Sequence, residues 1–468
     1  MDAAERYRAA LPAGAVVEFP ITALDRTGVP CWSVTLFPDG DRPAAAGTGY
    51  GDTDEHARAG AYGELVEEWR SWAALHSSSR RQASYRELVR SHGPDGVQDP
   101  RTLGLPAGAP YDDDRPLQWL PTTRLRDGAE VLVPAEFVAS SGHDLPGAPP
   151  PGGWLTVPVT NGLGAGLDPD RALAHALLEI VQRDGNGVTF RALDRGAVLD
   201  LAAVRDPVTL RTLDRLRAAG VEPLVKLAST ELGIPVVHAV GLAPDDGVLA
   251  GTAGGEAADP DRERAVRKAV LEFAAARPRK LLTHGPLDAA AALAPAGSEH
   301  RALAAVDLDG EEPRVLAAML TWLRGGLPPI RAELDRTVLS QLSVADFATL
   351  PSSSAPALSF LDGFDVLVRD LSGNGVHAVK AIVPGLDVET VAYGRIGERT
   401  VRRLRELGRD DLVTVGDRGA ARVHLTPAAE ERLGGPAWLD RDAVGRAVGG
   451  LLPLYREPGR HAAQVALR

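Results

Sequence analysis

The chain has 468 residues, of which 44% are hydrophobic and 24% charged, and its formal net charge is −12. This composition is typical of a folded globular protein, and the negative charge argues against a nucleic-acid-binding surface. No apolar run approaches the roughly 18 residues of a membrane span, and the N-terminus lacks the features of a signal peptide, so we expect a cytoplasmic protein. The only cysteine, Cys31, excludes an intrachain disulfide and a multi-cysteine zinc site.

Strand-like and helix-like segments alternate along the chain. Residues 16–38 contain two β-rich runs around an Asp-Arg-Thr-Gly turn. Residues 77–153 are rich in Pro, Gly, Ser and Asp, and we interpret them as an irregular excursion from the core. Residues 285–300 are the best candidate for a mobile surface loop. Residues 364–387 predict two strands around a Ser-Gly-Asn-Gly turn, and a basic helix follows at 398–407.

A glycine-rich loop, a polar cap and an alanine-rich helix occur together three times. Each helix carries a glutamate seven residues after an alanine, in the pairs Ala57/Glu64, Ala172/Glu179 and Ala265/Glu272. Seven residues is close to two helical turns, so each alanine and its glutamate share one face. Asp-Pro pairs at 168–169 and 259–260 favour helix starts. The pattern predicts three similar units whose loops present backbone N–H groups to a ligand.

The glutamates of these helices have two interpretations. Acidic residues in the first half of a helix stabilise it as ordinary surface groups. Alternatively, carboxylates from separate helices converge on Mg²⁺ ions that bridge the phosphates of a nucleotide. Glu64 and Glu67 share one stripe of their helix, and Glu179 and Gln182 repeat that spacing. No Gly-x₄-Gly-Lys-Ser/Thr sequence is present, which argues against a P-loop enzyme.

Five blocks of sequence, in order, resemble the YcaO-domain family over about residues 15–410. "GAYGELVEE" resembles the family's Ser-x₃-Glu-x₂-Glu-Arg motif, with Gly60 at the serine and Glu68 at the arginine. "TNGLGAGLDPDRALAHALLEIVQRDG" resembles the second block and has Gln182 in place of a glutamate. "GGEAADPDRERAVRKAVLEFAAARPRK" resembles the third, with Ala275 in place of a glutamine. "DLSGNGVHAVKAIVPGLD" and "GRIGER" resemble the last two.

The resemblance implies an α/β fold of YcaO-like mixed sheets with helices, in which three units surround one nucleotide cleft. It implies one domain over residues 1–468, with a core at about 15–410 and a C-terminal extension at 411–468. The implied cofactors are ATP and Mg²⁺. The implied Mg²⁺ ligands are Glu64, Glu67, Glu179 and Gln182, and the implied ATP-binding residues are Gly60, Arg183, Arg277 and Arg279. From the residues alone, each arginine is equally well an ordinary helix-surface group.

The implied activity is the ATP-dependent modification of a ribosomally made precursor peptide. Phosphorylation of a backbone amide oxygen leads to a thioamide or an azoline, with a macrocyclic amidine as an alternative product. The four replaced motif positions leave open a scaffold that binds peptide without catalysis. The chain lacks the Pro-x-Pro-x-Pro tail of azoline-forming cyclodehydratases, and no stretch predicts a leader-binding module. A TfuA-like or leader-binding partner protein is therefore expected, and a homodimer is an open alternative.

Overall fold

The computed structural model describes residues 2–38, 43–189, 196–241, 243, 245–296, 298, 303, 306–337 and 343–468. The chain divides into two compact units, each built from separated stretches of sequence. Unit 1 consists of Met1–Trp69, Arg191–Ser354 and Gly449–Arg468, and unit 2 of Arg70–Phe190 and Ala355–Val448. Within the described residues, no helix is both long enough and apolar enough to span a bilayer.

Unit 1 contains two sheets. The first is antiparallel in the order β1 (Ala15–Pro20), β2 (Cys31–Phe37), β3 (Ala45–Tyr50). The second has the order β11 (Gly254–Ala258), β10 (Val236–Val240), β9 (Leu224–Ser229), β8 (Ala197–Asp200), β12 (Val344–Asp346), and only its last pair is parallel. Helix α8 (Arg262–His284) packs on this second sheet through a core that includes Val237, Ala257 and Phe273.

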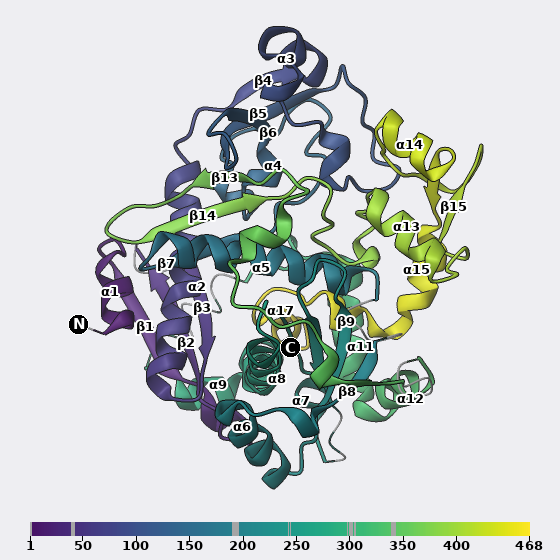
Figure 1. Cartoon of the computed structure of the whole chain (residues 1–468). Helices are drawn as coiled ribbons and strands as arrows, with labels where there is room; N and C mark the ends of the chain where they lie inside the picture. The colour runs from purple at the N-terminus through teal and green to yellow at the C-terminus, as the bar shows by residue number, and fades with distance from the viewer. Residues whose placement is uncertain are drawn as a thin grey trace. The chain divides into compact units, whose positions relative to one another are not determined.

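Unit 2 is organised around a six-stranded antiparallel sheet. Its strands are β4 (Arg81–Ser84), β5 (Pro116–Arg124), β13 (Leu367–Asp370), β14 (His377–Ile382) and β7 (Leu163–Gly166) in that order, with β6 (Glu130–Pro134) paired to β5. Trp119 on β5 is fully buried in the core, and its Nε1 donates a hydrogen bond to the carbonyl of Ala83. Helix α5 (Pro169–Gly187) contacts β7 and β14, as Figure 1 shows.

The remaining elements complete the two units. Unit 1 also contains α1 (Ala3–Ala9), α6 (Pro207–Ala218), α7 (Val248–Gly251), α9 (Leu287–Leu293), α11 (Pro313–Gly325), α12 (Leu327–Thr337), α16 (Leu452–Tyr455) and α17 (Ala462–Ala466). Unit 2 also contains α3 (Tyr85–His92), α4 (Ala135–Val138), α13 (Glu398–Glu406), β15 (Val413–Val415), β16 (Ala421–Arg422), α14 (Pro427–Leu433), β17 (Ala437–Leu439) and α15 (Arg441–Val448). Helix α2 (Asp54–Leu75) contains the boundary between the units.

The structure confirms the mixed α/β class and corrects two local predictions. The strand pairs expected in 16–38 and 364–387 and the helix expected at 398–407 are present as β1/β2, β13/β14 and α13. The predicted excursion at 77–153 is wrong, because it supplies three strands of the sheet in unit 2. The predicted mobile loop at 285–300 is wrong for the part that the structure describes up to residue 296. This part contains α9, whose Ala290 is buried.

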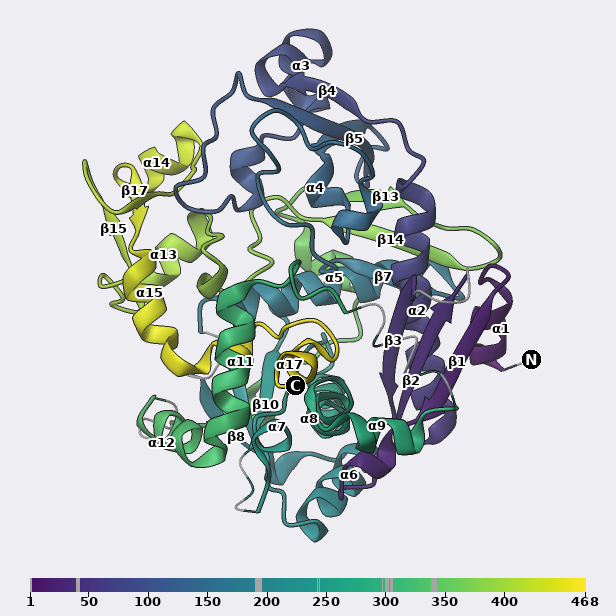
Figure 2. The same cartoon turned by 180° about the vertical axis from the view of Figure 1, so that it is seen from behind.

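The predicted C-terminal extension is not one structural segment. Residues 411–448 form a small part of unit 2 that includes the sheet β15-β17-β16, whereas Gly449–Arg468 belongs to unit 1. Both views place α17 beside α8 (Figures 1 and 2), and the amide N of His461 donates a hydrogen bond of 2.7 Å to Thr283 O near the end of α8. The single domain expected over 1–468 stays a prediction.

Candidate functional site

Each of the three repeats is a strand–helix motif, a short strand followed by the helix that packs on it: β3–α2, β7–α5 and β11–α8. The glycines of these strands lie against helix backbone. An added Cβ would lie 1.9 Å from Ala61 N at Gly49, 2.2 Å from Ala172 O at Gly164 and 2.2 Å from Ala269 O at Gly255. Glycine is therefore required at these three positions for the close approach of strand and helix.

The three aligned glutamates make the same kind of hydrogen bond, each within its own strand–helix motif. Thr48 N donates to Glu64 Oε2 at 2.6 Å, Gly162 N to Glu179 Oε2 at 3.0 Å and Glu256 N to Glu272 Oε2 at 3.3 Å. All three strands lie at the edge of their sheets, where backbone N–H groups lack a strand partner. One N–H group in each motif is thus taken by a helix carboxylate, and the prediction that the glycine-rich loops present N–H groups to a ligand stays a prediction.

The predicted helix starts are confirmed at one Asp-Pro pair and corrected at the other. Asp168 caps α5, with Pro169 at the first helical position. Helix α8 instead begins after Asp261, whose side chain accepts from Glu263 N. Asp259 forms ion pairs with Arg264 at 2.9 Å and Lys268 at 3.4 Å, so its side chain pairs with helix cations.

Unit 1 contains a cluster of charged groups around Glu64. The side chain of Glu64 is partly in contact with solvent, but the protein atoms packed around it weaken its hydration. This loss of hydration, together with the negative charge of Glu67, raises the pKa of Glu64 to about 7. Burial and the charges of Glu272 and Glu64 raise the pKa of Tyr50 well above its usual value. The charges of Glu64 and Glu272 therefore both act on the hydroxyl group of Tyr50.

Arg279 belongs to the same cluster but already has a carboxylate partner. Its Nη1 donates to Glu457 Oε2 at 2.8 Å and its Nη2 to Glu457 Oε1 at 3.3 Å. The charges of Glu457, Glu64 and Glu272 all raise the pKa of Arg279. Arg279 therefore supplies positive charge beside the two glutamates while the C-terminal stretch holds its guanidinium in place.

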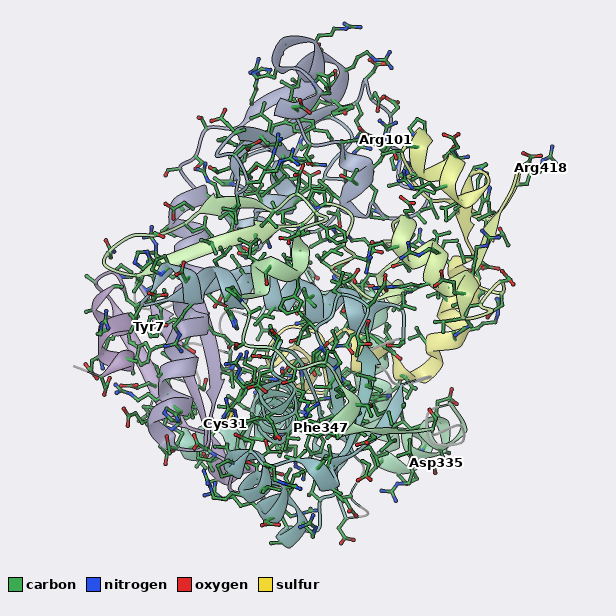
Figure 3. The ribbon with its side chains drawn as sticks, in the orientation of Figure 1. Tyr7, Cys31, Arg101, Asp335, Phe347 and Arg418 are labelled. Carbon is green, nitrogen blue, oxygen red and sulfur yellow. The ribbon has the colours of Figure 1, made fainter. Side chains whose placement is uncertain are left out.

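Arg277 has a structural role, which corrects its assignment to ATP. Its side chain is fully buried and donates two hydrogen bonds to Asp25, two to Asp246 and one to Ala250 O. All five N–H groups of a guanidinium are used by these contacts. A phosphate contact would require this buried network to break, so we assign Arg277 to the packing of α8. Cys31, labelled in Figure 3, is buried beside the same helix, 3.8 Å from Ala275 O.

In unit 2, α5 carries Glu179, Gln182 and Arg183 on adjacent turns. Arg183 Nη2 lies 3.4 Å from Glu179 Oε1, and Gln182 is partly exposed. The next residue, Asp184, is buried and accepts from Arg399 at 3.1 Å and Arg403 at 2.9 Å. These two contacts bind α5 to α13, which fixes the helix that presents Glu179.

The oxygen donors present fit Mg²⁺, although no preformed metal cage is visible. Within the described ranges, no three His, Cys, Asp or Glu side chains are grouped to hold a metal ion. Mg²⁺ commonly uses only one or two carboxylates and completes its shell with phosphate and water. Glu64 Oε1 has no hydrogen-bond partner among the described residues and a raised pKa, which suits a carboxylate that gains a cation. The expectation that the helices of both units share one cleft stays a prediction.

Sequence reasoning missed Glu457 and Lys380, and it noted Glu68 only as a replacement for the arginine of the family motif. Glu457 accepts a hydrogen bond from Arg279, which lies 178 positions earlier in the sequence, and no local sequence pattern predicts such a contact. Glu68 accepts from Ala46 N at 2.8 Å, and its place four residues after Glu64 on one helix face was an available signal. Lys380 in unit 2 donates to Val159 O and to Asn161 O at 2.7 Å, and burial lowers its pKa to about 8.

Comparisons with known proteins identify the family. The family model described as YcaO cyclodehydratase, ATP- and Mg²⁺-binding, matches residues 48–387. An uncharacterized protein of Methanothermobacter thermautotrophicus is 28% identical over 388 residues, covering 81% of this chain and 91% of its own. An uncharacterized protein in the tfuA 3′ region of Rhizobium leguminosarum bv. trifolii is 32% identical over 171 residues, covering 35% of this chain and 39% of its own.

Two solved structures share the fold. A heterocyclase in complex with substrate and cofactor has a TM-score of 0.63 at 17% identity and covers 87% of this chain, which spans 55% of the heterocyclase. YcaO from Methanopyrus kandleri bound with AMPPCP and Mg²⁺ has a TM-score of 0.55 at 21% identity, with 84% of this chain and 91% of its own covered. With a family model matched over residues 48–387, the chain belongs to the YcaO family, whose members bind ATP and Mg²⁺.

Proposed function

We propose that this protein is an ATP-dependent enzyme that activates backbone amides of a ribosomally synthesised precursor peptide and produces a thioamide or an azoline. The observation that carries the proposal is the pair of acidic residues kept on α2 in a YcaO chain: Glu64 has a free oxygen and a pKa near 7, with Glu67 one turn away. The tfuA-region relative supports thioamidation with a TfuA-like partner.

In this proposal the residues of each unit have separate tasks. Glu64 and Glu67 in unit 1, and Glu179 in unit 2, would hold Mg²⁺, with Gln182 as a neutral oxygen donor. Arg279 and Arg183 would lie near phosphate oxygens. ATP would supply the phosphoryl group that turns the amide oxygen into a leaving group, and Mg²⁺ would neutralise the charge of the phosphates. Hydrogen bonds from Thr48 N and Gly162 N hold one oxygen of Glu64 and of Glu179, while the other oxygen of Glu179 lies 3.4 Å from Arg183 Nη2.

The chemistry balances for both products. An amide is a poor electrophile because resonance stabilises it. Attack by a nucleophile gives an oxyanion, transfer of the terminal phosphoryl group of ATP releases ADP, and loss of phosphate restores the double bond. With sulfide as nucleophile the net change is oxygen replaced by sulfur, and with a neighbouring side chain it is the loss of one water. The two products therefore differ in peptide mass.

Calorimetry tests the nucleotide site. Glu64→Gln keeps the size of the side chain and removes its charge, so we expect Mg²⁺-ATP affinity to fall at least about tenfold, or about 1.4 kcal/mol. Glu55→Gln, on an exposed position of the same helix, is the matched control and should leave affinity unchanged. Equal affinity of Glu64→Gln and Glu55→Gln, with both variants folded, would refute the metal assignment.

A non-catalytic scaffold is the second candidate. Glu68, at the family's arginine position, is engaged with Ala46 N, and Ala275, at its glutamine position, is 3% exposed. Incubation with a precursor peptide and its partner protein decides between the two. ATP consumption that requires peptide, together with a changed peptide mass, supports the enzyme, and peptide binding without either supports the scaffold.

A further inference from the structure

One peptide group in unit 2, between Asn161 and Gly162, forms a hydrogen bond at each end. Gly162 N donates to Glu179 Oε2 at 3.0 Å, and Lys380 Nζ donates to Asn161 O at 2.7 Å. A peptide group is planar, so its C=O and its N–H keep fixed directions relative to each other. The contact that orients this C=O therefore also orients the N–H that Glu179 accepts.

The second strand–helix motif differs here from the other two. In those motifs the peptide group that donates to the glutamate lies within a strand, β3 or β11, which fixes it. Gly162 instead precedes β7 and has a φ of +84°, and its own carbonyl accepts from Ala381 N at 2.8 Å. The carbonyl of Asn161 lies one residue further from the strand, where a side chain, that of Lys380, supplies its hydrogen bond.

Lys380 contacts this turn from a fixed position in the sheet. It lies on β14 opposite Leu163 of β7, and it is 2% exposed. Its ammonium also donates to Val159 O, so one side chain holds two carbonyls of the turn. Burial lowers the pKa of Lys380, and the charge of Glu179 is the largest of the effects that oppose this shift. The charges of Lys380 and Glu179 therefore act on each other across the peptide group.

We propose that Lys380 is a positioning residue for Glu179: it orients the Asn161–Gly162 peptide group, whose N–H holds Glu179 Oε2. A cation that donates to the C=O also polarises the peptide group and makes its N–H a stronger donor. Groups that orient a metal ligand commonly change metal affinity about 10–100-fold when they are replaced. The step from Glu179 to Mg²⁺ rests on the proposed function, whereas the step from Lys380 to Glu179 does not.

Hydrogen–deuterium exchange at the Gly162 amide of the full chain, without nucleotide, tests the first step. Lys380→Met keeps the length of the side chain and removes its donors, so we expect this amide to exchange about fivefold faster. Arg369→Met is the matched control, because Arg369 lies opposite Lys380 on β13 and also donates to a backbone carbonyl, that of Pro121, at 3.1 Å. Gly162 exchange in Lys380→Met that is no faster than in Arg369→Met would overturn the proposal.

Urea unfolding shows whether each variant keeps its fold. Lys380→Gln is a second variant, which retains a polar group in the buried position and replaces Lys380→Met if that chain does not fold. Its side chain is shorter and neutral, so it should hold the turn less firmly, and the Gly162 amide should again exchange faster than in the control. Unchanged exchange in the folded Lys380→Gln chain would overturn the proposal as well.

Calorimetry of Mg²⁺-ATP binding tests the second step. We expect Lys380→Met to weaken the affinity about tenfold, and to have no further effect when Glu179→Gln is already present. An equal loss in both backgrounds would show a structural role that is independent of Glu179, and would overturn the proposal. Faster exchange of Gly162 with unchanged affinity in both single variants would support the positioning and remove Glu179 from the metal site, so the two failures are distinguishable.

Discussion

Replacement of Gly49 by alanine tests whether the glycines of β3 allow α2 to approach the strand. The added Cβ would lie 1.9 Å from Ala61 N and 2.1 Å from Ala57 O, whereas real Cβ atoms essentially never come closer than 3.0 Å to another heavy atom. Both neighbours are helix backbone, so neither can rotate away, and strand and helix must separate by about 1.1 Å (3.0 − 1.9). Overpacking costs ~1–3 kcal/mol and a disturbed Thr48–Glu64 hydrogen bond ~1 kcal/mol, so we expect a loss of ~2–4 kcal/mol.

Urea unfolding measures this loss, with Gly63→Ala as the matched control. Gly63 lies on the same helix, and a Cβ there would meet no atom within 4 Å. Alanine is the better helix former, so the control should gain about 0.5–1 kcal/mol. A Gly49→Ala variant within about 0.5 kcal/mol of the unchanged chain would refute the close approach of α2 to β3, since surface substitutions have effects of that size.

Three further predictions concern other parts of the chain. Arg277→Met leaves the buried Asp25 without the Arg277 cation and leaves Asp246 with the partly exposed Arg26, 3.0 Å away, so the free energy of unfolding in urea should fall by about 3–5 kcal/mol, and a loss below about 1 kcal/mol would contradict the buried network. Burial and a neighbouring aspartate raise the pKa of Asp387 to about 6, so the folded chain binds that proton more tightly than the unfolded chain. Its stabilisation is complete below about pH 4 and is lost as the pH rises through about 6, and Asp387→Asn should flatten the unfolding free energy over that range. Gly60→Ser restores the family residue at a position where a Cβ has its nearest neighbour at 3.5 Å, so calorimetry should show tighter Mg²⁺-ATP binding, and unchanged affinity would remove this position from the nucleotide site.

Local patterns in the sequence predicted the helices of the three strand–helix motifs well. Asp168 followed by Pro169 fixes a helix start by backbone chemistry alone, and the structure has it. The seven-residue spacing of Ala57 and Glu64 reports a shared helix face, because that spacing depends only on helix geometry. What the pattern could not reveal is the strand beneath: glycines read as loops are β3 residues, since sheet pairing is a non-local property.

The site was predicted less completely because its charged residues pair with residues that lie far away in the sequence. Arg277 and Arg279 look alike in sequence, two positions apart on one helix. The structure buries the first between two aspartates and leaves the second with Glu457. Which arginine can serve a ligand depends on partners 31 to 252 positions away, which no local spacing encodes.

The interleaving of the two units has a consequence for the order in which the chain is synthesised and folds. Unit 1 takes its last stretch from Gly449–Arg468, and unit 2 takes its last from Ala355–Val448. Neither unit is complete while the ribosome is still adding residues before 448. Until then, the apolar residues of both cores within the first 354 residues lack part of their packing partners. Chains that expose apolar surface for long periods are vulnerable to aggregation and depend on chaperones. Glu457, which neutralises Arg279 and lies within 3.5 Å of Lys280, is synthesised after the other two stretches of unit 1, so we expect a ribosome-stalled chain ending before it to be protease-sensitive throughout unit 1.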